Sequence, residues 1–223
     1  MSWCARFAAD RLIKIRLSIK QMKEYTTKTK IETFLCESVD GTLADIMLSV
    51  EDYIDGYTGR NFKADTTASA RKYSGNGSQE LSIDECVQIT KVELGNNEYG
   101  DTFTEITASG TNGYYLWPEN YASEVVPVRG IHLRGRYWTA GWANHQITAK
   151  WGYSAAVPSA ISQAATILAA CIYRHGAGGG IGGVKSEKIG DYSVSFSGEN
   201  GAALEAEFAR AKALMDKYKK FEI

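Results

Sequence analysis

The chain has 223 residues, of which 44% are hydrophobic and 23% charged, so it can bury a sizeable core and is not disordered by default. Its formal net charge of −1 excludes a general attraction to nucleic acid or to a membrane surface. It also lacks any apolar run near the roughly 18 residues that a membrane-spanning helix needs.

The first 30 residues are basic, although the whole chain is not. They contain eight basic and two acidic residues (net +6), and the remainder contains 17 basic and 24 acidic residues (net −7). A basic arm on an acidic body is a pattern of segments that touch polyanions. Five side chains are therefore candidates for contact with DNA or an acidic partner: Arg6, Arg11, Lys14, Arg16 and Lys20. A solvated helix face is the alternative interpretation.

Residues 1–28 are expected to form an extension outside the core. Charges interrupt every apolar stretch, which argues against a signal peptide. Met22 begins a sequence that reads like the natural opening of a domain, so residues 1–21 are expected to be weakly structured.

Two helices are expected next. Thr29 and Glu32 have the spacing of a capping box, which predicts a short helix through Leu35. A longer helix follows from Leu43, because apolar residues recur at helical spacing from there to Tyr57. Gly59 is placed to end it.

The pattern changes to a period of two from about residue 70 to residue 153. Short runs rich in β-branched and aromatic residues alternate with turn dipeptides. The expected strands are 70–74, 79–83, 87–94, 102–108, 113–117, 129–135 and 145–152. Four of the five tryptophans lie in this region, and aromatic residues at strand spacing are more often core than surface.

The C-terminal part returns to helix. Pro158 opens an alanine-rich, apolar helix that Gly176 ends, and a last amphipathic helix begins near Gly201. Between them lie a glycine-rich run and a short alternating strand, 192–196. The fold class is therefore α+β, with a bundle of about four helices and an inserted antiparallel β-sheet or small barrel. The expected units are the extension 1–28, a helical core of 29–68 and 154–223, and a β-rich insertion of 69–153.

One packing arrangement follows from the two widest apolar stripes. The first contains Leu43, Ile46, Val50 and Ile54, and the second contains Ile161, Leu168 and Ile172. Two such stripes need a common partner, so we expect them to pack together.

The sequence gives little sign of chemistry. Gly178 and Gly183 have the spacing of a phosphate-binding loop, but Val184 separates them from Lys185 and Ser186. The three histidines are too far apart to indicate a metal site, and no serine lies in a GxSxG elbow. The four cysteines are scattered, as expected of reduced thiols. We expect no enzyme, no cofactor and no metal.

Two stretches together resemble the head–tail connector (adaptor) proteins of tailed bacteriophages. The first runs from Thr42 to Phe62 and closes on Thr58-Gly59-Arg60-Asn61-Phe62. The second is the run 186–196, with Ile189-Gly190-Asp191-Tyr192-Ser193-Val194-Ser195-Phe196, before the final helix. Between them lie Tyr73-Ser74-Gly75, Leu81-Ser82-Ile83 and Trp151-Gly152-Tyr153. The resemblance covers most of residues 29–220. The long sheet and the N-terminal extension depart from the small, mostly helical family members.

The resemblance implies a structural subunit of the virion neck, assembled in the host cytoplasm. Such proteins form a homo-oligomeric ring, usually a dodecamer, beneath the portal protein. The ring extends the channel for double-stranded DNA and docks the next neck or tail completion protein, without contact to a membrane. The alternative is a virion β-domain that binds host glycans or receptors, or a decoration protein.

The segment 176–201 and the final helix are expected to carry assembly contacts. Ordering a glycine-rich backbone is costly, so the run 176–183 is not expected to hold one conformation in the free subunit. We expect it to become ordered when a neighbour docks. Contacts with the portal or another neighbour are expected at Tyr192, Val194, Phe196, Tyr218 and Phe221. Arg60 is expected at an intersubunit contact, with a structural ion pair as the alternative. The other alternative is that the strand and helix belong to the chain's own core.

Overall fold

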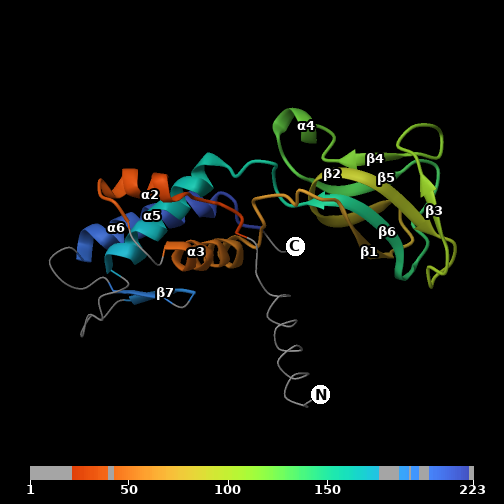
Figure 1. The fold of residues 1–223 in the computed structure, drawn as a ribbon. Coiled ribbons are helices and arrows are strands. Elements are labelled where there is room, and N and C mark those ends of the chain that lie inside the picture. Colours follow the sequence, from red (N-terminus) through yellow and green to blue (C-terminus); the bar gives the residue numbers. More distant parts are fainter. Residues whose placement is uncertain (1–21, 40–42, 176–185, 191, 196–200, 221–223) are drawn as a thin grey trace, which may run out of the picture.

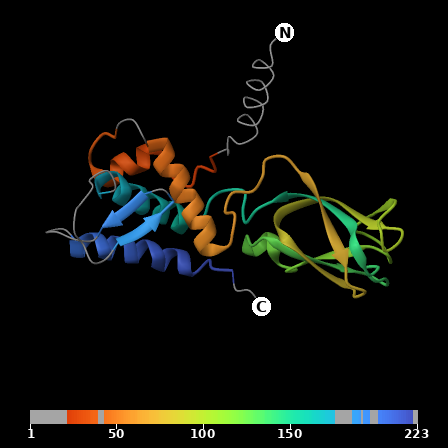
Figure 2. The same ribbon diagram turned by 90° about the horizontal axis from the view of Figure 1, so that it is seen from below.

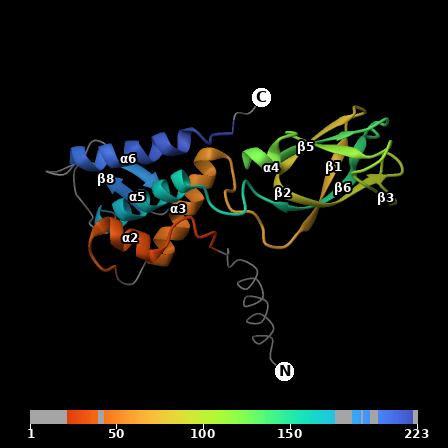
Figure 3. The ribbon, with the colours of Figure 1, turned by 90° about the horizontal axis from the view of Figure 1, so that it is seen from above.

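The computed structural model describes residues 22–39, 43–175, 186–190, 192–195 and 201–220. These residues form two lobes side by side, one mainly helical and one made of β-strands (Figure 1). Views from below and above show the same elongated arrangement (Figures 2 and 3). Two separate hydrophobic clusters fill the lobes, one in each. The α+β fold predicted from the sequence is confirmed, with an open sheet and not a closed barrel.

The helical lobe is built around one central helix, α5 (Ser159–His175), which contacts the three others. Those are α2 (Lys28–Leu35), α3 (Leu43–Thr58) and α6 (Gly201–Asp216). Much of α5 is fully buried, because alanines let the neighbouring helices approach closely. The predicted stripes of α3 and α5 lie in one cluster, which confirms their expected packing.

The start of α2 differs from the prediction, and the end of α3 agrees with it. The cap of α2 is Thr27, not Thr29; its hydroxyl accepts a hydrogen bond from the Lys30 amide at 3.4 Å. The predicted end of α3 is confirmed: Gly59 has a φ of +67°, the left-handed conformation that glycine adopts readily, and its amide bonds to the Asp55 carbonyl.

The β lobe contains one antiparallel sheet of six strands. These are β1 (Ser69–Gly75), β2 (Glu80–Gly95), β3 (Phe103–Ile106), β4 (Tyr114–Trp117), β5 (Val128–Leu133) and β6 (Gly141–Trp151). The order is β1-β6-β2-β5-β4, and β3 pairs with the last residues of β2. A short helix, α4 (Tyr121–Glu124), follows β4. Two of the predicted strands are joined in β2, whose register shifts near Cys86.

The chain crosses between the lobes twice, and the two crossings are hydrogen-bonded to each other. The Ala64 amide donates to the Ser154 carbonyl at 2.9 Å, and the Tyr153 amide donates to the Asn61 carbonyl at 2.7 Å. Gly152 has a φ of +135°, and a Cβ there would lie 2.5 Å from the Cα of Ala64. The close approach of the two crossings therefore requires glycine at this position.

Candidate assembly surfaces

The C-terminal hairpin contains two of the predicted contact residues. Strands β7 (Ser186–Ile189) and β8 (Tyr192–Ser195) pair with each other as a separate two-stranded sheet. At their turn, Gly190 packs on α3, since a Cβ there would meet the Ser49 side chain at 3.0 Å. Tyr192 and Val194 are thus in a hairpin of their own chain and not in the large sheet. Among the described strands none pairs with the outer edges of this hairpin, and such edges can accept a neighbour's strand.

Tyr218, another predicted contact, lies in an aromatic cluster where the helical lobe meets the crossings. Its ring is 5.5 Å from that of the buried Phe62 and 5.8 Å from that of Tyr153, both edge to face. The Lys220 amide also donates to the Thr58 carbonyl at 2.9 Å. These contacts fix the end of α6 within its own chain. A contact of Tyr218 with a neighbouring protein stays a prediction.

The same cluster holds the start of the described chain in place. The Tyr25 hydroxyl donates to the Asp55 carboxylate at 2.6 Å and accepts a hydrogen bond from the Phe62 amide at 2.8 Å. Burial and the neighbouring carboxylate raise the pKa of Tyr25, so the hydroxyl keeps its proton. The Glu51 carboxylate accepts hydrogen bonds from the Lys23 and Tyr25 amides. Residues 22–27 are therefore part of the helical lobe.

Arg60 connects the two lobes. It forms an ion pair with Glu85 on β2, and the two side chains are only 13% and 9% exposed. Its guanidinium carbon also lies 5.3 Å from the centre of the Tyr153 ring. This is the structural ion pair that the sequence analysis gave as the alternative role of Arg60. The intersubunit role assigned to Arg60 stays a prediction.

The remaining predicted contact residues lie outside the described residues. They are Phe196, Phe221 and the basic residues Arg6, Arg11, Lys14, Arg16 and Lys20. Within the described ranges, no group of three or more histidine, cysteine, aspartate or glutamate side chains is arranged to hold a metal ion. Every helix in that part of the chain is too short or too polar to span a bilayer.

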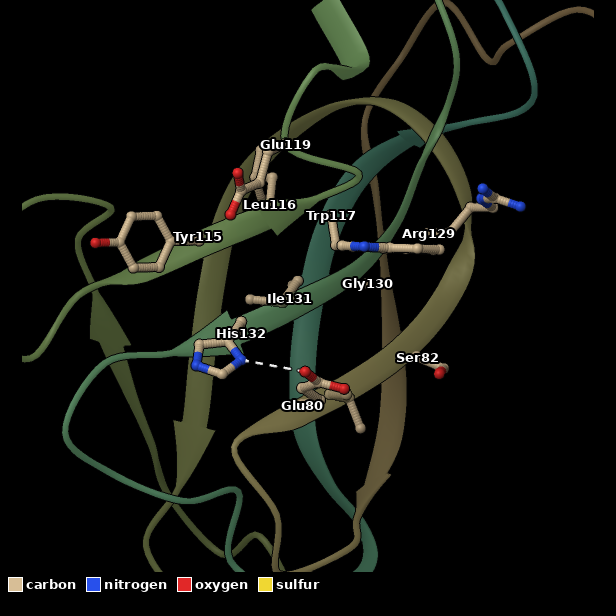
Figure 4. A pocket seen from close by; sticks show the side chains of 11 residues that line it. Glu80, Ser82, Tyr115, Leu116, Trp117, Glu119, Arg129, Gly130, Ile131 and His132 are labelled. Carbon is tan, nitrogen blue, oxygen red and sulfur yellow. Dashed lines mark ion pairs between the residues drawn. The ribbon is translucent and has the colours of Figure 1, made fainter.

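The outer face of the β lobe carries a groove that the sequence analysis missed. It lies over β2, β5 and β4 and has a volume of about 560 Å³ (Figure 4). Strand pairing places Tyr115, His132 and Glu80 in one row across the three strands, and Trp117, Gly130 and Ser82 in the next. Tyr115 and Trp117 are 49% and 54% exposed. Alternation along β4 puts these two rings on one face, but alternation alone does not say which face is covered.

The groove contains both apolar and polar groups. Arg129 lies with its guanidinium carbon 4.9 Å from the centre of the Trp117 ring. The His132 ring nitrogen is 3.5 Å from the Glu80 carboxylate, and Glu119 lies at the upper rim of the view in Figure 4. This arrangement can pack against a flat ligand surface and exchange hydrogen bonds with it.

Two solved structures have the same fold over nearly the whole chain. One is a chain in the neck of a native gene transfer agent (GTA) particle, computed with C12 symmetry; it is 16% identical, with a TM-score of 0.51. The other is from the neck of an empty GTA particle, computed with C6 symmetry, at 16% identity and a TM-score of 0.50. The matches cover 92% of this chain and 94% and 95% of those chains. No protein-family model matches the sequence, and no curated protein is significantly similar to it.

Proposed function

We propose that this chain is a structural subunit of the neck of a tailed, phage-like particle. The observation that carries this proposal is the fold likeness to neck chains, which extends over 92% of the chain and so includes both lobes. The sequence motifs in residues 42–62 and 186–196 resemble head–tail connectors and support the same role. The role is structural and not catalytic, and it needs no cofactor.

The subunit forms a closed homo-oligomeric ring, most simply of twelve copies. The C6 and C12 symmetries used for the similar necks support a cyclic assembly. A cyclic ring needs a heterologous interface, in which two different surfaces of each copy meet. The two-lobed shape offers such surfaces, among them the outer edges of the β7–β8 hairpin and the open edges of the large sheet. The hairpin is the preferred contact because the predicted residues Tyr192 and Val194 lie on it.

The partners of the ring are the portal protein above and the next neck or tail completion protein below. Double-stranded DNA passes through its channel. The contacts with DNA or an acidic neighbour are made by five basic residues of the N-terminal extension: Arg6, Arg11, Lys14, Arg16 and Lys20. The finished subunit is located in the virion neck, after assembly in the host cytoplasm.

The experiment that tests this role removes the gene and examines the particles by electron microscopy. A neck subunit is required after DNA packaging, so the expected products are filled heads without attached tails, together with free tails. Complementation with the wild-type gene should restore whole particles. Whole, tailed particles in the absence of the protein would show that the proposal is wrong.

A further inference from the structure

The groove on the outer face of the β lobe has a hollow at its centre. Gly130 on β5 is paired with Trp117 on β4 and with Ser82 on β2, so it lies between these two residues in one row across the sheet. A Cβ at Gly130 would lie 3.4 Å from the Leu81 carbonyl oxygen and 3.8 Å from the Cβ of Trp117, which are ordinary contacts. The backbone therefore does not require glycine here. Glycine leaves the row between Trp117 and Ser82 without a side chain, and Gly130 itself is a buried part of the groove floor.

The two exposed rings of the groove are held in place by cations. The guanidinium carbon of Arg129 is 4.9 Å from the centre of the Trp117 ring, and that of Arg134 is 3.6 Å from the centre of the Tyr115 ring. A cation covers one face of a ring and restricts its motion. Tyr115 and Trp117 are still about half exposed, so each ring offers further apolar surface to a ligand. A surface ordered before binding loses less entropy when a ligand arrives.

Hydrogen-bonding groups surround these rings. Glu80 and Glu119 provide carboxylate acceptors, Ser82 provides a hydroxyl, and Arg129 provides donors. Figure 4 shows Trp117 edge-on, with Arg129 to its upper right in the view and Glu80 and Ser82 below it. The two carboxylates are balanced by the two guanidinium groups on the rings, those of Arg129 and Arg134, so the site has no net charge that would select a charged ligand.

We propose that this groove binds a neutral saccharide. A sugar ring has C–H faces that pack on an aromatic ring and hydroxyl groups around its edge that both donate and accept hydrogen bonds. The groove has the same distribution, with aromatic rings beside a hollow and polar groups on both sides. Its volume of about 560 Å³ lies in the range of small-ligand sites, which is roughly 300–1,000 Å³.

A protein partner is the competing occupant, because tryptophan, tyrosine and arginine are also common at the centres of protein interfaces. Such centres are depleted of charged carboxylates, which a protein would have to desolvate. Here Glu80 is 83% exposed at its side chain and lines the groove. A saccharide hydroxyl can hydrogen-bond to this carboxylate while the site remains open to water, so the polar lining favours the saccharide.

The test uses the full chain and three neutral probes: maltotetraose, cellotetraose and chitotetraose. Binding is measured by saturation-transfer NMR and by titration of tryptophan fluorescence. At least one probe should bind, and Trp117→Ala should raise the Kd for that probe about tenfold or more. Trp142→Ala is the matched control: it removes an 85% exposed tryptophan of the same lobe that does not line the groove, and it should bind as the wild type does.

A second variant separates binding from folding. Gly130→Ala places a methyl group in the hollow at ordinary contact distances, so it should weaken binding at least about threefold and leave thermal unfolding unchanged. The proposal is wrong if the wild type binds none of the three probes at up to about 10 mM, or if Trp117→Ala binds as tightly as Trp142→Ala. Loss of particle assembly in Trp117→Ala without saccharide binding by the wild type would identify a protein interface instead.

Discussion

The buried ion pair between Arg60 and Glu85 should determine how strongly the two lobes stabilise each other. Glu85→Gln keeps the shape of the side chain and removes its charge. The guanidinium is then left without a counterion, at a position where only 13% of its side chain reaches solvent. Breaking a buried pair on one side costs about 3–5 kcal/mol, and the remaining amide oxygen can still accept a hydrogen bond, so we expect about 3 kcal/mol. For a chain of this length, that lowers the melting temperature by roughly 6–12 °C.

The assay is urea unfolding, followed by tryptophan fluorescence and by circular dichroism at 222 nm. Fluorescence reports on the β lobe, because the tryptophans in the described residues all belong to it, and circular dichroism reports mainly on the helices. Asp84→Asn is the matched control, because Asp84 pairs with Arg71 nearby but the two side chains are 53% and 44% exposed. This change should cost less than about 1 kcal/mol. Arg60→Met combined with Glu85→Leu should recover most of the loss, since it removes both charges. A cost below about 0.5 kcal/mol for Glu85→Gln would refute the reasoning.

Three further predictions concern packing, backbone and thiols. Leu168→Ala should lower the free energy of unfolding by about 2–5 kcal/mol in urea titrations, because Leu168 is fully buried on the central helix; a near-neutral effect would contradict its place in the core. Gly152→Ala should destabilise the chain, since its Cβ would lie 2.5 Å from the Cα of Ala64. The control is Gly56→Ala, inside α3 with open space around it, which should be neutral or stabilising by up to about 1 kcal/mol. Equal melting temperatures of the two variants would show that the crossing tolerates a side chain. Burial raises the pKa of the Cys86 and Cys171 thiols to about 12, so at pH 8 both should stay unlabelled by a thiol reagent in peptide mapping while the exposed Cys36 reacts; rapid labelling of either in the native protein would be inconsistent with the described core.

The long periodic elements could be predicted from the sequence because burial on one side leaves a regular pattern. The stripe of α3 is buried as expected, and the β region starts and ends close to the predicted positions. The junction between the predicted strands 79–83 and 87–94 could not be anticipated. Asp84 and Glu85 are polar residues between the two predicted strands, but β2 continues through them, because Cys86 pairs with Val128 on β5 and with Trp151 on β6. The charge of Glu85 is paired with that of Arg60 from the other lobe.

The groove shows a second limit of sequence reasoning. Alternation in Tyr114-Tyr115-Leu116-Trp117 separates two faces but does not reveal which one the rest of the chain covers. In the structure Tyr114 and Leu116 are partly buried against the β-lobe core, and Tyr115 and Trp117 face outward. The hollow at Gly130 depends on pairing between strands that are distant in sequence. Only the register of the sheet brings these residues together.

The most direct test of the proposed role is the mass of the complex that the full chain forms with a purified portal ring. Mass photometry should show that the portal gains one discrete step, equal to twelve subunits of 24.5 kDa, and electron microscopy of that complex should show a closed ring beneath the portal. The chain without the portal provides the baseline. If the chain leaves the portal mass unchanged, or binds it without forming a closed ring, the proposed neck role is contradicted.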